Sequence, residues 1–138
     1  MPHTQHATEP LKKIRTSKVR TLLLRHLEES KKPMSGDEIL AKIRISVPSC
    51  NKTSVYRELS YLEKAGSIIA VRFHDRKIRY ELSSLPHHHH AVCISCGSIE
   101  DVRMPAHVQA VEKRLQKESR FKVTHHALEF FGLCLHCQ

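Results

Sequence analysis

Apolar residues in the first part of the chain recur at intervals of three and four, the spacing that places them on one face of an α-helix. The first set lies within residues 16–30 and comprises Val19, Leu22, Leu23 and Leu27. Proline cannot continue a helix, so we expect this one to end before Pro33. Ser35, followed three residues later by Glu38, forms a capping-box motif that predicts a second short helix. Its inward face is Ile39, Leu40 and Ile43.

A third helix is predicted from Asn51 to Ala65, and Gly66 supplies the residue that ends it. The apolar positions Val55, Leu59 and Leu62 follow the i, i+4, i+7 pattern of a buried face. The outward side then carries polar and aromatic residues, which are Lys52, Thr53, Tyr56, Arg57 and Ser60.

After the third helix the pattern changes to strand-like alternation over residues 68–73 and again over 78–82, with a polar turn at 74–77. This predicts a β-hairpin. Three short helices followed by a basic hairpin are typical of a winged helix-turn-helix, in which the last helix enters the major groove of DNA and the hairpin touches the backbone.

The stretch Ser83–Pro86 interrupts this pattern and predicts a boundary between two domains, residues 1–83 and 84–138. In the second domain we expect a strand at 98–102, a helix at 106–117 and a long strand at 121–131. The inward face of the helix should be Val108, Val111 and Leu115. The predicted fold class is α+β, a winged helix followed by a small α/β domain.

The net charge of +9 belongs almost wholly to the first domain. Residues 1–82 hold 17 Lys and Arg against 9 Asp and Glu, whereas residues 83–138 hold 6 against 5. Such a bias favours a polyanionic partner, here double-stranded DNA, although a solvated basic face is the plainer alternative. The candidate DNA contacts are Arg15, Arg20, Lys52, Thr53, Ser54, Tyr56 and Arg57. Tyr56 could instead cap the core, and Arg57 could pair with Glu58 or Glu63.

No apolar run approaches the roughly 20 residues that span a bilayer, and the N-terminus lacks the apolar stretch of a secretion signal. We therefore expect a cytoplasmic protein with no membrane partner. In that reducing compartment, clustered cysteines bind metal more often than they form disulfides.

Two Cys-x-x-Cys pairs, Cys93/Cys96 and Cys134/Cys137, predict a tetrahedral thiolate site for Zn²⁺. Its four positions are filled, so its role should be structural rather than catalytic. A redox role is the alternative, but neither pair lies between a strand and a helix of a βαβ unit. Cys50 stands apart, and we interpret it as a buried thiol, with an exposed redox-sensitive thiol as the alternative.

Four consecutive histidines, His87–His90, precede the first cysteine pair. In an extended segment alternate residues face one side, so His88 and His90 form one ligand pair and His87 and His89 another. Both pairs cannot serve one ion, which predicts sites beyond the thiolate zinc. A solvated linker is the alternative interpretation of the run.

Four stretches carry a dense and ordered set of marks: Thr53–Leu59, Tyr80–Leu82, His87–Gly97, and Phe121–Glu129 followed by Gly132, Cys134 and Cys137. With these marks the chain resembles, over nearly its whole length, the ferric-uptake regulator (Fur) family of bacterial metal-dependent transcription factors. The resemblance implies a homodimeric repressor that binds a palindromic operator through its winged helices and dimerises through its C-terminal domains.

The resemblance also implies ligand sets. The regulatory site that joins the two domains would use Glu81, His88, His90 and, as in peroxide-sensing members, Asp101. A further site in the dimerisation domain would use His87, His89 and His126. Imidazole and carboxylate suit Zn²⁺, Fe²⁺ or Mn²⁺, so the ligands do not choose the regulatory metal.

Two positions depart from the family pattern. Members of the family commonly carry a histidine ligand ahead of the second helix, where this chain has Pro33. The regulatory site must then use Glu81 alone from the winged-helix side, recruit His74, or be degenerate. A glutamate used elsewhere in the family corresponds to Gln109, with His107 and Glu112 nearby as substitutes.

We expect a metal-responsive repressor, with no enzymatic role and no small organic substrate. Two alternatives within DNA regulation are a peroxide sensor and a zinc-stabilised DNA binder that senses no metal. A metalloenzyme would need an open coordination position, a pocket and a base, and only Glu81, Glu100 and Asp101 offer such a base.

Overall fold

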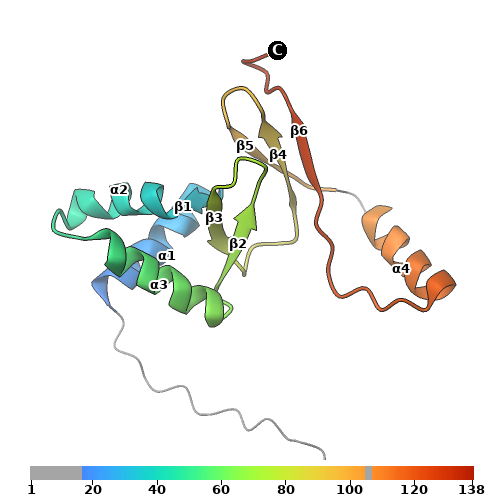
Figure 1. The fold of residues 1–138 in the computed structure, drawn as a ribbon, viewed down its shortest axis with the longest axis horizontal. Helices are drawn as coiled ribbons and strands as arrows, with labels where there is room; N and C mark the ends of the chain where they lie inside the picture. Colours follow the sequence, from blue (N-terminus) through green and yellow to red (C-terminus); the bar gives the residue numbers. More distant parts are fainter. Residues whose placement is uncertain (1–16, 105–106) are drawn as a thin grey trace, which may run out of the picture.

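A computed structural model describes residues 17–104 and 107–138 (Figure 1). Arg15, one of the candidate DNA contacts, lies outside these residues. The elements in chain order are α1 (Lys18–Ser30), β1 (Met34–Ser35), α2 (Gly36–Ser46), α3 (Lys52–Lys64), β2 (Ile68–Arg72), β3 (Ile78–Leu82), β4 (His89–Cys93), β5 (Ile99–Val102), α4 (His107–Ser119) and β6 (Glu129–Gly132). This mixture of helices and two small sheets confirms the predicted α+β class.

The first three helices begin at polar caps that the sequence encodes. Ser17 and Asn51 accept hydrogen bonds from backbone amides in the first turns of α1 and α3. Ser35 and Glu38 form the predicted capping box at the start of α2. Past the end of α3, Gly66 adopts φ of +73°, a conformation that glycine reaches without steric cost.

The apolar faces of these helices form one core. Leu23, Ile39, Ile43, Val55 and Leu59 are fully buried, as the helical periodicity predicted. Cys50 also lies in this core and is 6% exposed, which confirms its interpretation as a buried thiol. The core fixes α3 against α1 and α2, so that the polar side of α3 faces outward.

The first sheet has the strand order β1-β3-β2, and both pairings are antiparallel. β2 and β3 form the predicted hairpin, with Ile68 opposite Leu82 and Arg72 opposite Ile78. We call the β2–β3 hairpin the wing. Tyr80 of β3 packs into the helical core, which attaches the wing to the three helices.

The second sheet has the order β5-β4-β6. β4 pairs antiparallel with β5, and it pairs parallel with β6 through His90 opposite Glu129 and Cys93 opposite Gly132. The prediction of one long strand over residues 121–131 is wrong for 121–128, which pair with no strand of the described chain. In the parallel register His90 stands opposite Glu129, so residues 121–127 extend beyond the start of β4 at His89 and have no strand residue opposite them.

Helix α4 stands apart from both sheets (Figure 1). Val111 and Leu115 are 59% and 47% exposed, so the prediction that they face inward is wrong for the single chain. The periodicity correctly indicated an amphipathic helix, but neither sheet of the described residues covers its apolar face.

A small second core joins the two sheets. Phe73, at the end of the wing strand β2, is 5% exposed and packs with Val71 of the wing and with Val92 and Ile99 of the second sheet. The wing and the second sheet therefore share buried contacts rather than only a connecting segment. Within the described residues, no helix has the length and apolar character needed to cross a membrane.

Candidate metal centres and nucleic-acid interface

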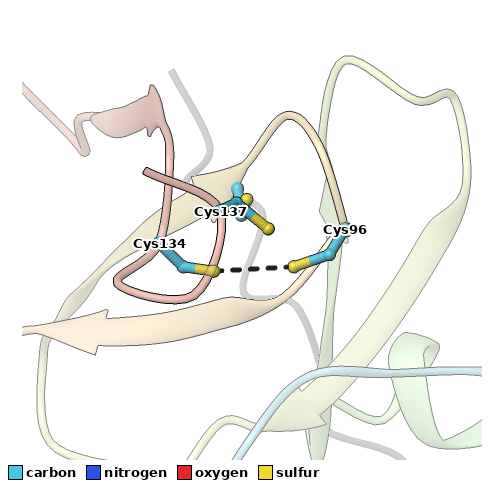
Figure 2. Close-up of side chains that lie close together, drawn as sticks. Cys96, Cys134 and Cys137 are labelled. Atoms are coloured by element: carbon cyan, nitrogen blue, oxygen red, sulfur yellow. Dashed lines mark hydrogen bonds between the residues drawn. The ribbon is translucent and has the colours of Figure 1, made fainter.

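The four cysteines of the two Cys-x-x-Cys pairs form one cluster, with all four sulfur atoms within 4.8 Å of one another. Cys96 comes from the turn between β4 and β5, and Cys134 and Cys137 come from the segment after β6 (Figure 2). The Sγ atoms of Cys96 and Cys134 lie 3.7 Å apart. Sulfurs about 2.3 Å from a tetrahedral Zn²⁺ are separated by roughly 3.8 Å, so the cluster fits that ion.

The surroundings of the cluster favour ionised sulfur at some positions and oppose it at others. Backbone amides of Cys96 and Cys134 lower the pKa of Cys93 to about 6. At Cys137 a hydrogen bond with Ser95 lowers the pKa, but the neighbouring sulfurs outweigh it and raise the pKa to about 12. Four adjacent thiolates repel one another, and a cation among them removes this conflict.

A second cluster joins the wing to the second sheet. Glu81 lies on β3, His90 lies on β4, and His88 directly precedes β4. The Nε2 atoms of the two histidines are 3.2 Å apart, and each is 3.2 Å from Oε2 of Glu81. Ligand atoms about 2.0 Å from a tetrahedral metal are separated by roughly 3.3 Å, so these three atoms have the spacing of one metal face.

Hydrogen bonding orients this cluster for coordination. Nδ1 of His88 donates to the carbonyl oxygen of Pro86 at 2.7 Å, which turns Nε2 of the ring toward Glu81. Burial raises the pKa of Glu81, but the bonds and charges of His90 and His88 outweigh burial and lower it overall. The carboxylate is therefore held ionised, which is the form that binds metal.

Two neighbours of this cluster bear on the predicted ligand set. Asp101 on β5 has Oδ1 3.8 Å from Nε2 of His90, so it lies beside the three ligands but outside their 4.8 Å group. Pro33 is buried and offers no donor atom. His74 is exposed and packs edge-on against Phe131, with ring centroids 4.9 Å apart. Among the described residues, Glu81 alone represents the winged-helix side in this cluster.

The third cluster contains His87, His89 and His126. Nε2 of His126 is 3.0 Å from Nε2 of His87 and 3.3 Å from Nε2 of His89. Burial and the neighbouring imidazoles lower the pKa of His89, which favours the neutral form that coordinates metal. Gln109, which stands in place of the family's glutamate, is exposed on α4, whereas Glu112, one of its two possible substitutes, contacts His126. The side chain of His107 lies outside the described residues.

The outward side of α3 carries most of the candidate DNA contacts. Lys52, Thr53, Tyr56 and Arg57 are exposed, and Ser54 is half-buried beside the Asn51 cap. Within the described part of the chain, Arg57 forms no ion pair, so neither Glu58 nor Glu63 holds it. Its guanidinium is available to a groove or a phosphate.

Tyr56 is held in a defined place by residues at the start of α2. Its hydroxyl donates to Oδ1 of Asp37 at 3.3 Å, and Lys52 Nζ lies 3.1 Å from the same oxygen. Lys52 lowers the pKa of Asp37 through a hydrogen bond and its charge. A Cβ atom added at Gly36 would lie 2.5 Å from Cζ of Tyr56, so only glycine leaves room for the ring.

Arg20 differs from the other candidate contacts. Its Nε donates to Oε2 of Glu58 at 2.6 Å, and its guanidinium lies 4.2 Å from the centroid of the Tyr61 ring. The ion pair is largely buried, with 13% of the Arg20 side chain exposed. These contacts support a role in fastening α1 to α3, and we leave Arg20 out of the proposed interface.

Sequence reasoning missed the residues that surround the clusters. Phe73 packs edge-on against His90, with ring centroids 5.5 Å apart, and the Arg79 guanidinium lies 5.3 Å from the centroid of Phe73. Asp37 was likewise not singled out. The sequence could have pointed to Phe73, because it is an aromatic residue between strand β2 and a polar turn. The contacts of Asp37 could not be predicted in this way, because they depend on how α2 packs against α3.

The chain combines a winged helix with a small sheet, one four-sulfur cluster and two histidine clusters. These features define the class of DNA-binding proteins that carry metal sites. The family model for the ferric uptake regulator family matches residues 12–131, and the chain belongs to this family.

The chain is similar both to ferric uptake regulation proteins and to peroxide-responsive repressors. The chain is 30% identical over 126 residues to the ferric uptake regulation protein of Campylobacter jejuni, covering 90% of this chain and 80% of that protein. It is 29% identical over 125 residues to the peroxide-responsive repressor PerR of Staphylococcus aureus, covering 91% and 83%.

A solved structure agrees with the fold. The ferric uptake regulator Fur of Helicobacter pylori, whose structure is described as revealing three functional metal binding sites, superposes with a TM-score of 0.81. The two share 29% identity, and the match covers 90% of this chain and 82% of that one. Members of this family are transcription regulators, and this chain has the three side-chain clusters of a metal-binding member.

Proposed function

We propose that this protein is a metal-responsive transcriptional repressor that binds a palindromic operator as a homodimer when its regulatory site is filled. The observation that carries the proposal is the cluster of Glu81, His88 and His90. Glu81 lies on the wing, His90 lies on the second sheet and His88 directly precedes that sheet, so a filled site must hold these two parts together. A repressor of this kind acts on chromosomal DNA, which places it in the cytoplasm.

The four-cysteine cluster would hold a structural Zn²⁺, and the Glu81 cluster would hold a regulatory Zn²⁺, Fe²⁺ or Mn²⁺. When bound, the regulatory ion supplies the positive charge that a carboxylate and two imidazole lone pairs coordinate together. Asp101 is placed to join this set, because β5 pairs with β4 directly beside His90. His87, His89 and His126 would form a third site.

The chain's own residues link that site to DNA. Glu81 lies on the wing strand that also carries Tyr80, and Tyr80 packs into the core beneath the recognition helix α3. Fixing Glu81 against His88 and His90 fixes the orientation of α3 relative to the second sheet. If the second sheets of two copies are joined, this orientation sets the spacing of the two recognition helices. Metal thereby raises operator affinity through its preference for that arrangement.

The dimer is supported by apolar side chains that the described residues of a single chain leave exposed. Val111 and Leu115 on α4, with Phe130 and Phe131 on β6, are each at least 42% exposed. A two-fold symmetric partner could cover the exposed face of α4 and would supply the second recognition helix for the second half-site. Direct contacts to DNA would come from Lys52, Thr53, Ser54, Tyr56 and Arg57.

A peroxide-sensing function is the second candidate. The observation in its favour is Asp101 beside His90, a mixed carboxylate and imidazole environment, together with the similarity to PerR of Staphylococcus aureus. Pro33 argues against it, since this chain lacks the histidine that family members commonly place there. Operator affinity measured before and after exposure to hydrogen peroxide distinguishes the two candidates.

The direct test of the proposal removes the weaker metal and keeps the zinc. A mild chelator should lower operator affinity by about 5- to 150-fold while elemental analysis still finds one Zn per chain, because the coupling energy between sites is typically 1–3 kcal/mol. Glu81→Gln should bind the operator weakly with or without added metal. Glu100→Gln, on the exposed side of β5, is the matched control and should respond as the unaltered protein does. Operator binding that is indifferent to the chelator would contradict the proposal.

A further inference from the structure

The third cluster brings together three imidazole nitrogens of the same kind. His89 is the first residue of β4, His87 lies two residues before it, and His126 lies three residues before β6. In all three rings it is the Nε2 atom that points to the common centre, at separations of 3.0 and 3.3 Å from His126. Something must hold the His126 ring with this nitrogen inward, because it lies in a segment without regular structure.

The other nitrogen of His126 is held from α4. Nδ1 of His126 lies 2.5 Å from Oε1 of Glu112, and the two side chains are 20% and 25% exposed. An ionised carboxylate only accepts hydrogen bonds, so the proton of the ring resides on Nδ1. In a neutral imidazole this leaves a lone pair on Nε2, directed at His87 and His89.

We infer that Glu112 is the positioning residue of this cluster and not one of its ligands. The inference rests on the proposed role of the three histidines as a metal site. Glu112 bonds to the side of the His126 ring that faces away from His87 and His89, and it belongs to no group of three ligand atoms within 4.8 Å among the described residues. Carboxylates placed in this way behind metal-binding histidines fix the ring and raise its basicity.

The consequence is a site whose ligands from this chain are nitrogen alone. The Glu81 cluster mixes a carboxylate oxygen with two nitrogens, whereas the third cluster has three imidazole nitrogens. All-imidazole ligand sets suit Zn²⁺, Co²⁺, Ni²⁺ or Cu²⁺, while Mn²⁺ prefers oxygen. The third site should therefore reject Mn²⁺ even at concentrations that fill the Glu81 site.

Glu112 also links helix α4 to the segment that precedes β6. α4 stands apart from both sheets (Figure 1), and the bond from Glu112 to His126 ties it to the segment that leads into β6. Ordering the third site should for this reason order the helix that carries the exposed Val111 and Leu115.

The experiment compares two substitutions at one position. Metal affinity is measured by chelator competition and by the visible spectrum of bound Co²⁺, in full-length protein that retains its cysteine zinc and carries Glu81→Ala to disable the regulatory site. Glu112→Gln should stay within about threefold of its parent, because the amide oxygen still accepts the Nδ1 proton. Glu112→Ala should bind about 10- to 100-fold more weakly. Glu118→Ala, an exposed α4 carboxylate paired with Arg114, is the matched control and should change nothing.

Each outcome decides the question. Equal losses in Glu112→Gln and Glu112→Ala would overturn the inference, because they would make the carboxylate a ligand. No loss in Glu112→Ala would overturn it too, because the residue would then have no role. His126→Ala separates this inference from the proposal beneath it: if that variant also keeps full affinity, the histidines bind no metal and the proposed third site itself fails.

Discussion

At the scale of single residues, the arrangement around Tyr56 shows how close contacts set the surface offered to DNA. Gly36 leaves room for the ring of Tyr56. Asp37 accepts a hydrogen bond from the Tyr56 hydroxyl and forms an ion pair with Lys52. The negative charge of Asp37 weakens the attraction of this surface for DNA phosphates. Its bonds to Tyr56 and Lys52 compensate, because they hold two of the proposed DNA-contacting side chains in place.

Gly36→Ala tests this contact. The new Cβ would lie 2.5 Å from Cζ of Tyr56, so the ring must leave its place. We expect operator affinity to fall by about 10-fold, in line with the loss of one specific contact to DNA. Fluorescence anisotropy with labelled operator measures this. Gly132→Ala is the control, since nothing lies within 4 Å of a Cβ there. Equal affinities of the two variants would show that the place of Tyr56 does not matter.

The sequence identified the ligand residues better than the residues that orient them. Cysteine spacing and alternation in the histidine run separate Cys93/Cys96, His88/His90 and His87/His89, and the structure groups these residues in the same way. Glu112 and Phe73 act through contacts between segments far apart in the chain, which no local periodicity encodes. Pro33 shows the reverse case, because a missing donor is evident from the sequence alone.

At the scale of elements, the helices of the winged helix could be predicted because each carries its own start, stop and buried face. The capping box of Ser35 and Glu38 and the glycine after α3 are local signals, and the structure follows them. The strand over residues 121–128 could not be predicted correctly, because a strand exists only where a partner does. The prediction that the apolar face of α4 is buried is wrong for a related reason, since the described part of one chain leaves Val111 and Leu115 exposed.

An ion pair between Arg79 and Asp75, which we call the clasp, holds the tip of the wing. Nη1 and Nη2 of Arg79 donate to the two carboxylate oxygens of Asp75 at 3.1 and 2.7 Å. The hydrogen bond from Arg79 lowers the pKa of Asp75 from 3.8 to about 2. Arg79 also lies over Phe73, so the clasp stiffens the part of the wing that packs on the second sheet.

This clasp predicts a pH dependence. The folded-state pKa of Asp75 is below its unfolded value, so its stabilising contribution is fully present above pH 3.8 and is lost as the pH falls toward 2. Asp75→Asn should therefore be less stable than the unaltered protein at pH 6, and the difference should shrink between pH 4 and pH 2. Urea unfolding at several pH values measures it. A difference that stays constant down to pH 2 would show that the carboxylate charge contributes nothing. Glu100→Gln, which alters an exposed carboxylate that forms no ion pair with the other described residues, is the comparison.

At the scale of the whole molecule, the junction between wing and second sheet is the feature on which the proposed regulation depends. Phe73, Val92 and Ile99 bury apolar surface there, and the Glu81 cluster lies beside them, with Phe73 against the ring of His90. A filled site and a packed junction therefore favour the same arrangement of the two halves. Such coupling between an ion and a distant DNA surface is reciprocal by thermodynamic necessity.

The most direct measurement of this account is the affinity of the regulatory metal with and without operator DNA, in protein that retains its cysteine zinc. The account predicts that saturating operator raises metal affinity by the same factor by which the metal raises operator affinity, about 5- to 150-fold. It also predicts that Glu81→Gln abolishes both effects together. Metal affinity that is unchanged by the operator would contradict the account, because the site would then be filled without any preference for the DNA-binding arrangement.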